Sequence, residues 1–316
     1  MRLLWEGPRD AFLKHGPVDS HGGVDLNILV VYKKNFEEVH DAGFMALRGV
    51  LQARAAPHHH VDYTPREHVQ RSDFIARDLV IVLGGDGTLT SLSHNIDAAT
   101  PVMGVNSHPR YDDPEGSVGF YMDSSIATFE EDFARVLEGT AIVNELPRLQ
   151  AVIDTTSGNR FTTDPAMNDL LIANTHQYAP SKYHLRRGAQ HTQQQSSGLL
   201  FSTWLGQGAW LRNAMSEDEF GELERRIDGD EVDDCYFVLA RDLPVAQRLG
   251  APWSWADWTE ATTTITSDMH RGYVVTDGWD EIQFNRGATI AVNLKAPKLT
   301  LLTFRQSMRE KLRLER

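Results

Sequence analysis

The 316-residue chain has one cysteine, Cys235, and lacks any long apolar run. A single cysteine excludes an intrachain disulfide and a cysteine-based zinc cluster. No stretch approaches the roughly 18 apolar residues of a transmembrane helix. The first residues, MRLLWEGPRDAF, place acidic residues and a proline where a signal peptide needs an apolar core. We therefore expect a cytoplasmic protein with no membrane partner.

Positive charge is also scarce, with 31 Lys and Arg against 44 Asp and Glu and a net charge of -13. This balance repels a nucleic-acid backbone unless a basic patch overrides it. The basic clusters are short and lie at residues 182–187 and 305–316. The second cluster mixes both signs and carries apolar residues at helical spacing. We expect no nucleic-acid partner and a helical tail over 305–316.

Strand and helix signals alternate in the first part of the chain. Apolar runs occur at 26–32, 79–83 and 101–105, and residues 124–139 have the apolar spacing of a helix. Such alternation is typical of an α/β domain with a parallel sheet. The pattern predicts a Rossmann-like domain over residues 1–145.

After residue 145 the pattern changes to short extended runs separated by turn signals. LQAVIDTT at 149–156, TTTITS at 262–267 and KLTLLTF at 298–304 are examples. Many short strands with turns between them indicate packed antiparallel sheets. The sequence therefore predicts a β-sandwich over residues 146–304, so that the whole fold is α/β plus all-β.

The stretch GGDG, residues 84–87, follows a buried strand and precedes a helical segment. Glycines permit positive φ and close approach of the backbone to a phosphate, and a helix N-terminus adds partial positive charge. The loop matches neither G-x-G-x-x-G nor a Walker A sequence. A carboxylate at Asp86 is unfavourable for simple anion binding, which indicates a role as proton acceptor or Mg²⁺ ligand. The alternative is a tight turn in which Asp86 only caps the helix.

Five motifs follow one another along the chain: GGDGT at 84–88, PVMGVNSHP to GSVGFY at 101–121, AMNDLLIAN at 166–174, SSGLLFSTWLGQGAW at 196–210 and SDMHRGYVVTDGWDEIQFNRGATIAV at 267–292. In this order they resemble the motifs of the NAD kinase family, within the NAD kinase and diacylglycerol kinase superfamily. Their sequences are most similar to those of mitochondrial-type and related bacterial members.

This resemblance implies an active site between a Rossmann-like domain and a β-sandwich, in a homodimer. It implies transfer of a phosphate from ATP or inorganic polyphosphate, with Mg²⁺ or another divalent cation, to the 2′-hydroxyl of the adenosine ribose of NAD or NADH. Asp86 is then the general base, and Gly84, Gly85, Gly87 and Thr88 shape the phosphate loop. The dinucleotide-binding residues implied are Asn106, Asn168, Asp169, Ser197, Thr203, Gly206, Gln207, Gly208, Ala209 and Trp210.

The second glycine-rich loop departs from the family pattern. Leu205, Gln207 and Gly208 occupy positions where the family has small hydroxyl residues. A leucine cannot donate a hydrogen bond to a nucleotide, and a glutamine would reach a different point. Trp210 keeps an aromatic face for stacking on a base, although a tryptophan in a helix core would look the same. Asp169 shortens the family's commoner glutamate by one methylene.

Three further residues are candidates for the site. His184 and Arg186 would share one face of a strand, where they could contact phosphates or simply line the surface. Asp277 matches the closing D-G of the family, whose simpler interpretation is a β-turn.

Three functional hypotheses follow from these observations. The first is an NAD kinase, and the second is a lipid kinase of the diacylglycerol or sphingosine type, which also carries GGDGT. The absence of an apolar or basic membrane-facing stretch disfavours the lipid kinase. The third is a dinucleotide-binding homologue that has lost turnover, because the altered loop would permit binding without phosphoryl transfer.

Overall fold

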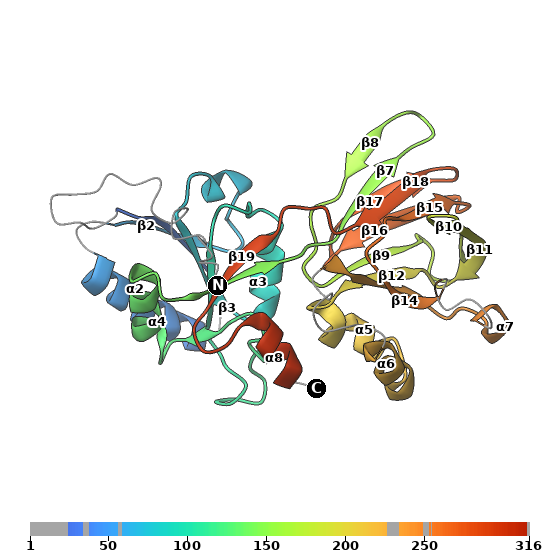
Figure 1. Cartoon of the computed structure of the whole chain (residues 1–316). Helices are drawn as coiled ribbons and strands as arrows, with labels where there is room; N and C mark the ends of the chain where they lie inside the picture. Colours follow the sequence, from blue (N-terminus) through green and yellow to red (C-terminus); the bar gives the residue numbers. More distant parts are fainter. Residues whose placement is uncertain are drawn as a thin grey trace, which may run out of the picture. The chain divides into compact units, whose positions relative to one another are not determined.

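The computed structural model describes residues 25–33, 38–55, 59–225, 234–248, 253 and 255–314. The chain divides into two compact units. Residues 1–145 and 299–316 belong to the first unit, and residues 146–298 form the second. Figure 1 shows a mixed helix and sheet arrangement in the first unit and packed sheets in the second. The predicted combination of an α/β domain with an antiparallel β-sandwich is confirmed.

The first unit is built on one sheet with strand order β2-β1-β3-β4-β19-β6, and β5 pairs with β4. The pairs β1–β2, β1–β3, β3–β4 and β4–β19 are parallel. Its strands are β1 (Asn27–Tyr32), β2 (His60–Pro65), β3 (Leu79–Gly84), β4 (Val102–Asn106), β5 (Ser124–Ser125), β6 (Ile142–Leu146) and β19 (Leu299–Thr303). Its helices are α2 (Glu38–Ala55), the 3-10 turn η1 (Arg71–Phe74), α3 (Asp86–Ser93), α4 (Phe129–Leu137) and α8 (Met308–Leu314).

The apolar run of β3 forms the centre of this sheet, and every residue of the strand is buried. Leu47 and Leu51 of α2 and Phe129 and Phe133 of α4 pack in the same core cluster. A parallel strand covered by helices is expected to read as a continuous apolar run, as β3 does. The carboxyl end of β3 leads directly into the GGDG loop.

The second unit consists of two six-stranded antiparallel sheets. We call β11-β10-β15-β18-β7-β8 the first sandwich sheet and β14-β13-β12-β9-β16-β17 the second sandwich sheet. The strands of the first are β7 (Gln150–Asp154), β8 (Arg160–Thr162), β10 (Ser181–Arg187), β11 (Gln190–Ser196), β15 (Thr263–Ser267) and β18 (Thr289–Asn293). The strands of the second are β9 (Asp169–Asn174), β12 (Leu199–Thr203), β13 (Tyr236–Ala240), β14 (Ala256–Thr259), β16 (Arg271–Thr276) and β17 (Trp279–Asn285).

One apolar core joins the two sandwich sheets. It combines Ile153 and Leu185 of the first sheet with Ile172 and Phe201 of the second. A second cluster covers the other face of the second sheet, where Leu211 and Phe220 pack on Leu200, Phe237 and Leu239. These two contacts come from the short helices α5 (Trp210–Asn213) and α6 (Glu217–Glu224); η2 (Gly206–Gly208) and α7 (Val245–Arg248) complete the unit.

The end of the chain differs from the sequence prediction. Residues 299–304 were expected in the sandwich, but β19 pairs with β4 through Leu301 and Leu302 and belongs to the first unit. The tail contains the expected helix, α8, which docks through the buried side chains of Met308 and Leu312. A short apolar run such as LTLLT predicts a strand without stating which sheet it joins.

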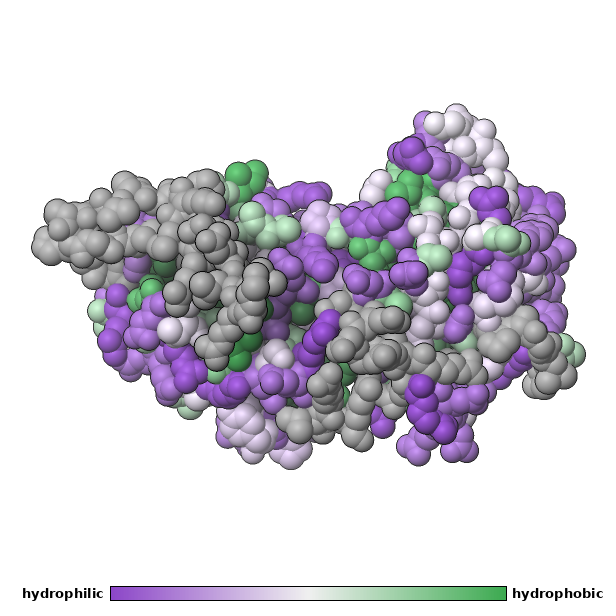
Figure 2. Space-filling model, in the orientation of Figure 1, coloured by the Kyte–Doolittle hydropathy of each residue, from purple (hydrophilic) through white to green (hydrophobic). Residues whose placement is uncertain are grey.

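The described surface visible in Figure 2 is mainly hydrophilic, with hydrophobic residues in small groups. Scattered apolar residues are normal on a folded protein. Among the described helices, none has the length and apolar character that a membrane span needs.

We predict that Leu302→Ala destabilises the first unit by about 2–5 kcal/mol, because Leu302 is 2% exposed within the main core cluster of that unit. Urea unfolding of both proteins measures the change. Lys298→Ala, at an exposed position just before β19, serves as the control and should shift the midpoint little. Equal effects of the two substitutions would contradict the packing of β19 in the core of the first unit.

Candidate active site

The GGDG loop joins the end of β3 to the start of α3. A Cβ on Gly84 would lie 2.5 Å from the Thr88 Oγ1 atom, and one on Gly85 would lie 2.9 Å from the Ser117 side chain. Gly87 is exposed, and a Cβ there would meet nothing within 4 Å. None of these glycines has positive φ. Gly84 and Gly85 are therefore required for close packing, which corrects the expectation of positive φ, and Gly87 leaves the loop open on one side.

The carboxylate of Asp86 is held by residues 117–121, which we call the clamp segment. The Gly119 N–H donates to its Oδ2 atom at 2.8 Å and the Ser117 hydroxyl donates to the same atom at 3.1 Å. The Tyr121 N–H donates to its Oδ1 atom at 2.8 Å. Within the part of the chain that the structure describes, Oδ1 accepts this one hydrogen bond and keeps a second lone pair, on a carboxylate whose orientation is fixed. This is the geometry that a proton acceptor needs.

Asn106, at the end of β4, shapes the clamp segment. Its Nδ2 atom donates to the Ser117 carbonyl at 3.3 Å, and its Oδ1 atom accepts from the His108 N–H at 3.1 Å. Gly119 has φ of +76°, and a Cβ there would lie 2.6 Å from the Asn106 Nδ2 atom. Asn106 is 4% exposed. The structure thus uses this predicted ligand residue to support the loop around Asp86.

In the second unit, Asp277 organises residues 167–169, which we call the Asn-Asp turn. Asp277 lies with φ of +49° in the turn between β16 and β17. Its Oδ2 atom accepts from the Met167 N–H at 2.7 Å, and its Oδ1 atom accepts from the N–H groups of Asn168 at 2.8 Å and Asp169 at 3.0 Å. The β-turn interpretation of Asp277 is correct, and its carboxylate also fixes two predicted site residues.

Asp169 is 8% exposed at the start of β9. Burial, and then the nearby charge of Asp277, raise the pKa of Asp169 to about 7. Near neutral pH the carboxyl group therefore exists in both forms. The protonated form donates a hydrogen bond, whereas the ionised form only accepts.

The second glycine-rich loop packs against the Asn-Asp turn through Thr203 and Gly206. The Thr203 hydroxyl donates to the Met167 carbonyl at 2.5 Å and accepts from the Gly206 N–H at 3.1 Å. A Cβ on Gly206 would come within 2.2 Å of the Asn168 carbonyl oxygen. Glycine is therefore required at position 206 for this contact.

Of the three positions that depart from the family pattern, Leu205 and Gln207 are buried and Gly208 is exposed. Leu205 and Gln207 are each 3% exposed, and the Gln207 Nε2 atom donates to the Trp204 carbonyl at 2.8 Å. Among the described residues, none donates to the Gln207 Oε1 atom. Gly208 and Ala209 are exposed. Leucine and glutamine thus fill the interior here, and the exposed part of the loop is mostly backbone.

Trp210 is not a core residue, because its side chain is 37% exposed. The Arg241 guanidinium lies over the ring at 5.0 Å from its centroid. One aromatic face is thus engaged by a cation, an arrangement that favours a fixed ring orientation.

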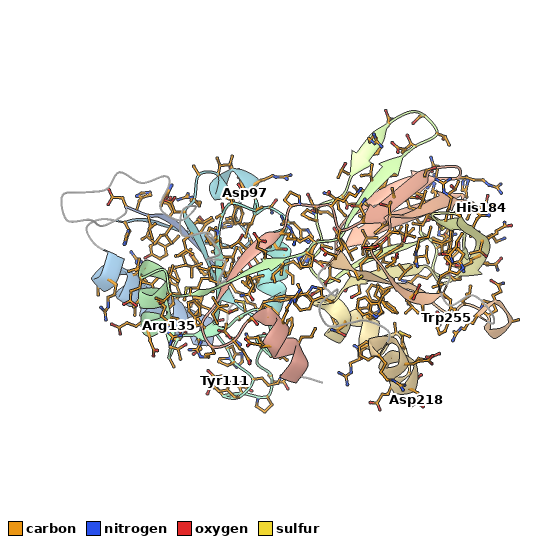
Figure 3. The ribbon with its side chains drawn as sticks, in the orientation of Figure 1. Asp97, Tyr111, Arg135, His184, Asp218 and Trp255 are labelled. Atoms are coloured by element: carbon orange, nitrogen blue, oxygen red, sulfur yellow. The ribbon has the colours of Figure 1, made fainter. Side chains whose placement is uncertain are left out.

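Three predicted residues lie away from the Asn-Asp turn. Ser197 is exposed before the start of β12, whereas Thr203 lies at the other end of that strand. His184 and Arg186 lie on β10 in the first sandwich sheet, facing away from its core, and Figure 3 marks His184 there. The His184 Nε2 atom pairs with Asp268 at 3.1 Å. The structure does not bring these residues to the group formed by Asn168, Asp169 and Asp277.

The clamp segment was missed as a functional element. Its sequence, SVGFY, was noted only as part of a longer motif, and the clamp segment acts through two backbone N–H groups and one serine hydroxyl. Backbone donors leave no signature in residue type, apart from glycine at a position with positive φ.

Within the described residues no group of three or more His, Cys, Asp or Glu side chains forms a metal site.

We predict a difference between two neighbouring glycine substitutions. Gly206→Ala should lower the thermal midpoint of the second unit by several degrees, because the new Cβ displaces the Asn168 carbonyl. Gly208→Ala is the matched control, since a Cβ there has no neighbour within 4 Å. Scanning calorimetry measures both. Similar midpoints for the two variants would refute the packing role of Gly206.

A second prediction concerns pH. The carboxyl of Asp169 has a pKa of about 7 in the folded protein and about 4 when unfolded. Between these values the folded state binds the additional proton, so the stability contributed here falls as pH rises from about 4 to about 7 and is level above that range. Asp169→Asn should remove this part of the slope. Urea unfolding at several pH values measures it, and an unchanged slope would show that Asp169 titrates normally.

Comparison with known proteins shows similarity to NAD kinases. Residues 30–141 match the family model described as the ATP-NAD kinase N-terminal domain. The chain is 30% identical over 153 residues to a "Probable NADH kinase" of Oryza sativa subsp. japonica, covering 43% of this chain and 46% of that protein. It is 26% identical over 232 residues to an NAD kinase of Pseudomonas fluorescens, covering 71% and 70%. The chain spans less than half the length of two of these curated relatives, 46% of the rice protein and 33% of an NAD kinase of Clostridium perfringens.

Two solved structures share the fold. The NAD kinase of Archaeoglobus fulgidus in complex with ATP has a TM-score of 0.65 and 16% identity, covering 91% of this chain and 99% of that one. Yeast NADH kinase complexed with NADH has a TM-score of 0.69 and 14% identity, covering 89% and 84%. The family-model match, the curated relatives and the shared fold agree. The chain is thus similar to NAD kinases, most clearly over residues 30–141, and shares their fold.

Proposed function

We propose that this chain is an NAD kinase, which transfers the terminal phosphoryl group of ATP or polyphosphate to the 2′-hydroxyl of the adenosine ribose of NAD or NADH. The observation that carries the proposal is the Asp86 carboxylate, oriented by the clamp segment beside the exposed Gly87. The similarity to NAD kinases supports it, as does the fold shared with an NAD kinase solved in complex with ATP and an NADH kinase solved with NADH.

The proposed chemistry is an in-line displacement with Asp86 as general base. The 2′-oxygen attacks the terminal phosphorus while its proton passes to the Asp86 Oδ1 atom. The bond from phosphorus to the bridging oxygen of the donor breaks, and ADP or a shortened polyphosphate leaves with the electron pair. Oδ1 suits this role because it accepts only the Tyr121 N–H among the hydrogen bonds described above.

We assign the donor phosphates to the open side of the GGDG loop. The Asp86 N–H donates to the Ser117 hydroxyl at 3.3 Å and the Thr88 N–H donates to the Gly85 carbonyl at 2.9 Å, so we assign the Gly87 N–H to the phosphate. The helix dipole adds partial positive charge there. Gly87 leaves space for a phosphate, whereas Gly84, Gly85 and the buried Thr88 shape the loop from within. Backbone donors thus supply the binding in the absence of a Walker lysine.

We also propose Mg²⁺ or another divalent cation as a requirement. Mg²⁺ takes one or two carboxylates and completes its ligand set with water and substrate phosphates. Among the described residues no cluster of three or more His, Cys, Asp or Glu side chains offers a ready ligand set, and the free position on Asp86 is assigned to the proton, so the ion would be held mainly by the donor phosphates and water. When bound, the ion would neutralise charge on the donor phosphates.

The second unit is proposed to bind the dinucleotide. Asn168 and Asp169 supply an amide and a carboxyl group for the ribose hydroxyls, and Asp277 holds both residues in place. In the second glycine-rich loop we assign ligand contacts to the exposed Gly208, Ala209 and Trp210 instead of the buried Leu205 and Gln207.

A homodimer and a cytoplasmic location are also proposed. The dimer is the usual assembly of the family that the chain resembles, and light scattering of the purified protein measures it. The location stays the expectation drawn from the composition and the single cysteine.

The test is formation of NADP or NADPH by the purified protein given Mg²⁺, NAD or NADH, and ATP or polyphosphate. We expect Asp86→Asn to lower kcat by about 10²–10⁴-fold, because the variant has lost its proton acceptor. Asp97→Asn is the matched control. Asp97 also accepts backbone and hydroxyl bonds in the same unit, from Ala99 and Thr100, but lies in the turn after α3.

Equal activity of the wild-type and Asp86→Asn proteins would overturn the role of Asp86. Absence of product with every donor, while NAD still binds, would instead indicate a dinucleotide-binding homologue. Product formed from a diacylglycerol or sphingosine acceptor, and not from NAD, would indicate the lipid kinase.

A further inference from the structure

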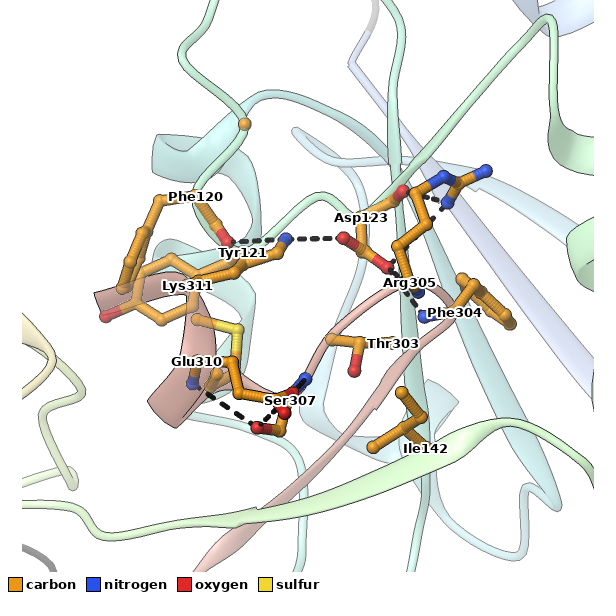
Figure 4. Close-up of polar contacts among 12 residues, drawn as sticks. Phe120, Tyr121, Asp123, Ile142, Thr303, Phe304, Arg305, Ser307, Glu310 and Lys311 are labelled. Carbon is orange, nitrogen blue, oxygen red and sulfur yellow. Dashed lines mark hydrogen bonds and ion pairs between the residues drawn. The ribbon is translucent and has the colours of Figure 1, made fainter. Parts of the chain in front are cut away.

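The C-terminal helix α8 contacts the segment that holds Asp86. Lys311 of α8 has a side chain that is 11% exposed, and its Nζ atom pairs with the Asp123 Oδ1 atom at 2.6 Å. The same Nζ atom donates to the Phe120 carbonyl oxygen at 3.2 Å. Figure 4 shows the ammonium group between these two oxygens. Lys311 therefore reaches a carbonyl inside the clamp segment from a position 191 residues further along the chain.

The Phe120 carbonyl and the Tyr121 N–H belong to one peptide group. A trans peptide is planar, and its C=O and N–H bonds point in opposite directions. The Tyr121 N–H donates to the Asp86 Oδ1 atom at 2.8 Å. Lys311 and Asp86 thus bind opposite ends of the same peptide group, with a positive charge at the oxygen and a negative charge at the hydrogen.

This arrangement has two physical consequences for Asp86. A cation at a carbonyl polarises the peptide, and hydrogen bonds in a chain strengthen one another in a low-dielectric interior. The peptide plane is also fixed, because rotation would break both bonds at once. Both effects favour a single position of the Oδ1 atom, which is the atom assigned to accept the proton.

Asp123 keeps the Lys311 ammonium group in place. Its Oδ2 atom accepts from the N–H groups of Phe304 at 2.6 Å and Arg305 at 3.1 Å. Burial alone would raise the pKa of Asp123, but the Lys311 charge and these hydrogen bonds hold it below the usual value. The carboxylate is therefore ionised at neutral pH and pairs with the lysine.

The rest of α8 is anchored independently of Lys311. Met308 and Leu312 are buried, and the Met308 N–H donates to the Asn144 Oδ1 atom at 2.8 Å. Ser307 and Glu310 cap the start of the helix through reciprocal hydrogen bonds. Removing the lysine side chain therefore leaves several contacts that keep the helix docked.

We propose that Lys311 is a positioning residue for Asp86, acting through the peptide group between Phe120 and Tyr121. Its effect on catalysis rests on the proposed function of Asp86 as the general base. Its effect on the clamp segment is independent of that function. The C-terminal tail thereby becomes a part of the phosphoryl-transfer site in the first unit.

The test separates the lysine contact from its ion pair. Lys311→Met alone removes the closer of the two cations paired with the buried Asp123 carboxylate and leaves only Arg305, at 3.7 Å, which can impair folding. We therefore compare Asp123→Asn with the double variant Lys311→Met/Asp123→Asn. The asparagine oxygen retains an acceptor for the Phe304 and Arg305 N–H groups, so the difference between the two proteins reports on the contact with Phe120.

We expect faster hydrogen exchange in the double variant at residues 117–123, which contain the Gly119 and Tyr121 amides, and unchanged exchange in β1. In the kinase assay we expect kcat to fall by about tenfold relative to Asp123→Asn, with the KM for NAD changed less than about twofold, because the base is misplaced and the dinucleotide contacts are intact. Replacing Lys311 by arginine instead of methionine in the double variant keeps the positive charge and should retain most of the kcat of Asp123→Asn.

Ser307→Ala provides the structural control, because it removes the helix cap without touching the contact of Lys311 with Phe120. We expect it to lower the thermal midpoint and leave kcat unchanged. A loss of kcat as large as that of the double variant would assign the effect to helix stability and overturn the proposal.

Exchange at 117–123 that is the same in Asp123→Asn and the double variant would also overturn it, whatever the activity. Altered exchange with unchanged kcat, in an enzyme that Asp86→Asn inactivates, would overturn the catalytic part. If Asp86→Asn itself stays active, the assignment of Asp86 fails separately, and the exchange experiment still decides whether Lys311 holds the clamp segment.

Discussion

Carboxylates that accept backbone N–H groups hold both parts of the candidate site in place. Asp86 accepts from Gly119 and Tyr121 in the first unit, and Asp277 accepts from Met167, Asn168 and Asp169 in the second. Charge-assisted hydrogen bonds of this kind are roughly twice as strong as neutral ones. They also connect segments that lie far apart in the sequence, so each turn depends on a side chain supplied from elsewhere.

Hydrogen bonds between a carboxylate and backbone N–H groups have different roles in the two units. In the first unit the accepting carboxylate is itself the proposed reactive group, and the backbone orients it. In the second unit the carboxylate of Asp277 orients the backbone, and the neighbouring Asp169 carries the perturbed pKa. Two carboxyl groups near one another in a buried turn disfavour simultaneous ionisation. The stability of the Asn-Asp turn is thereby coupled to pH, whereas the clamp around Asp86 depends on the packing of α8.

Much of the fold could be predicted from local patterns. The apolar run of β3 and the glycines after it correctly predicted a strand-to-helix turn at the carboxyl end of a strand in a parallel sheet. The short alternating strands after residue 145 correctly indicated a sandwich. The assignment of β19 failed because five apolar and hydroxyl residues carry no information about their partner strand. Its parallel pairing with β4 is decided by contacts between residues about 200 positions apart.

The candidate site was predictable only where residue type carries the chemistry. Asp86 was singled out because a carboxylate in a glycine-rich turn is distinctive, whereas Asn168, Asp169 and Asp277 were singled out through their resemblance to the family motifs. The roles of all four residues stay predictions. The clamp segment acts mainly through backbone groups, and Lys311 acts from the far end of the chain, so neither has a local signature. From the sequence, the replacement of family hydroxyl residues by Leu205 and Gln207 suggested lost ligand contacts. In the structure both side chains fill the protein interior.

The central claim is that the Asp86 carboxylate meets the hydroxyl that is phosphorylated. The most direct measurement is a crystal structure of this protein with NAD bound. We predict that the 2′-oxygen of the adenosine ribose lies within about 3 Å of the Asp86 Oδ1 atom, within hydrogen-bonding reach for proton transfer. A ribose bound with that oxygen turned away from Asp86, toward a different side chain able to accept a proton, would contradict the claim.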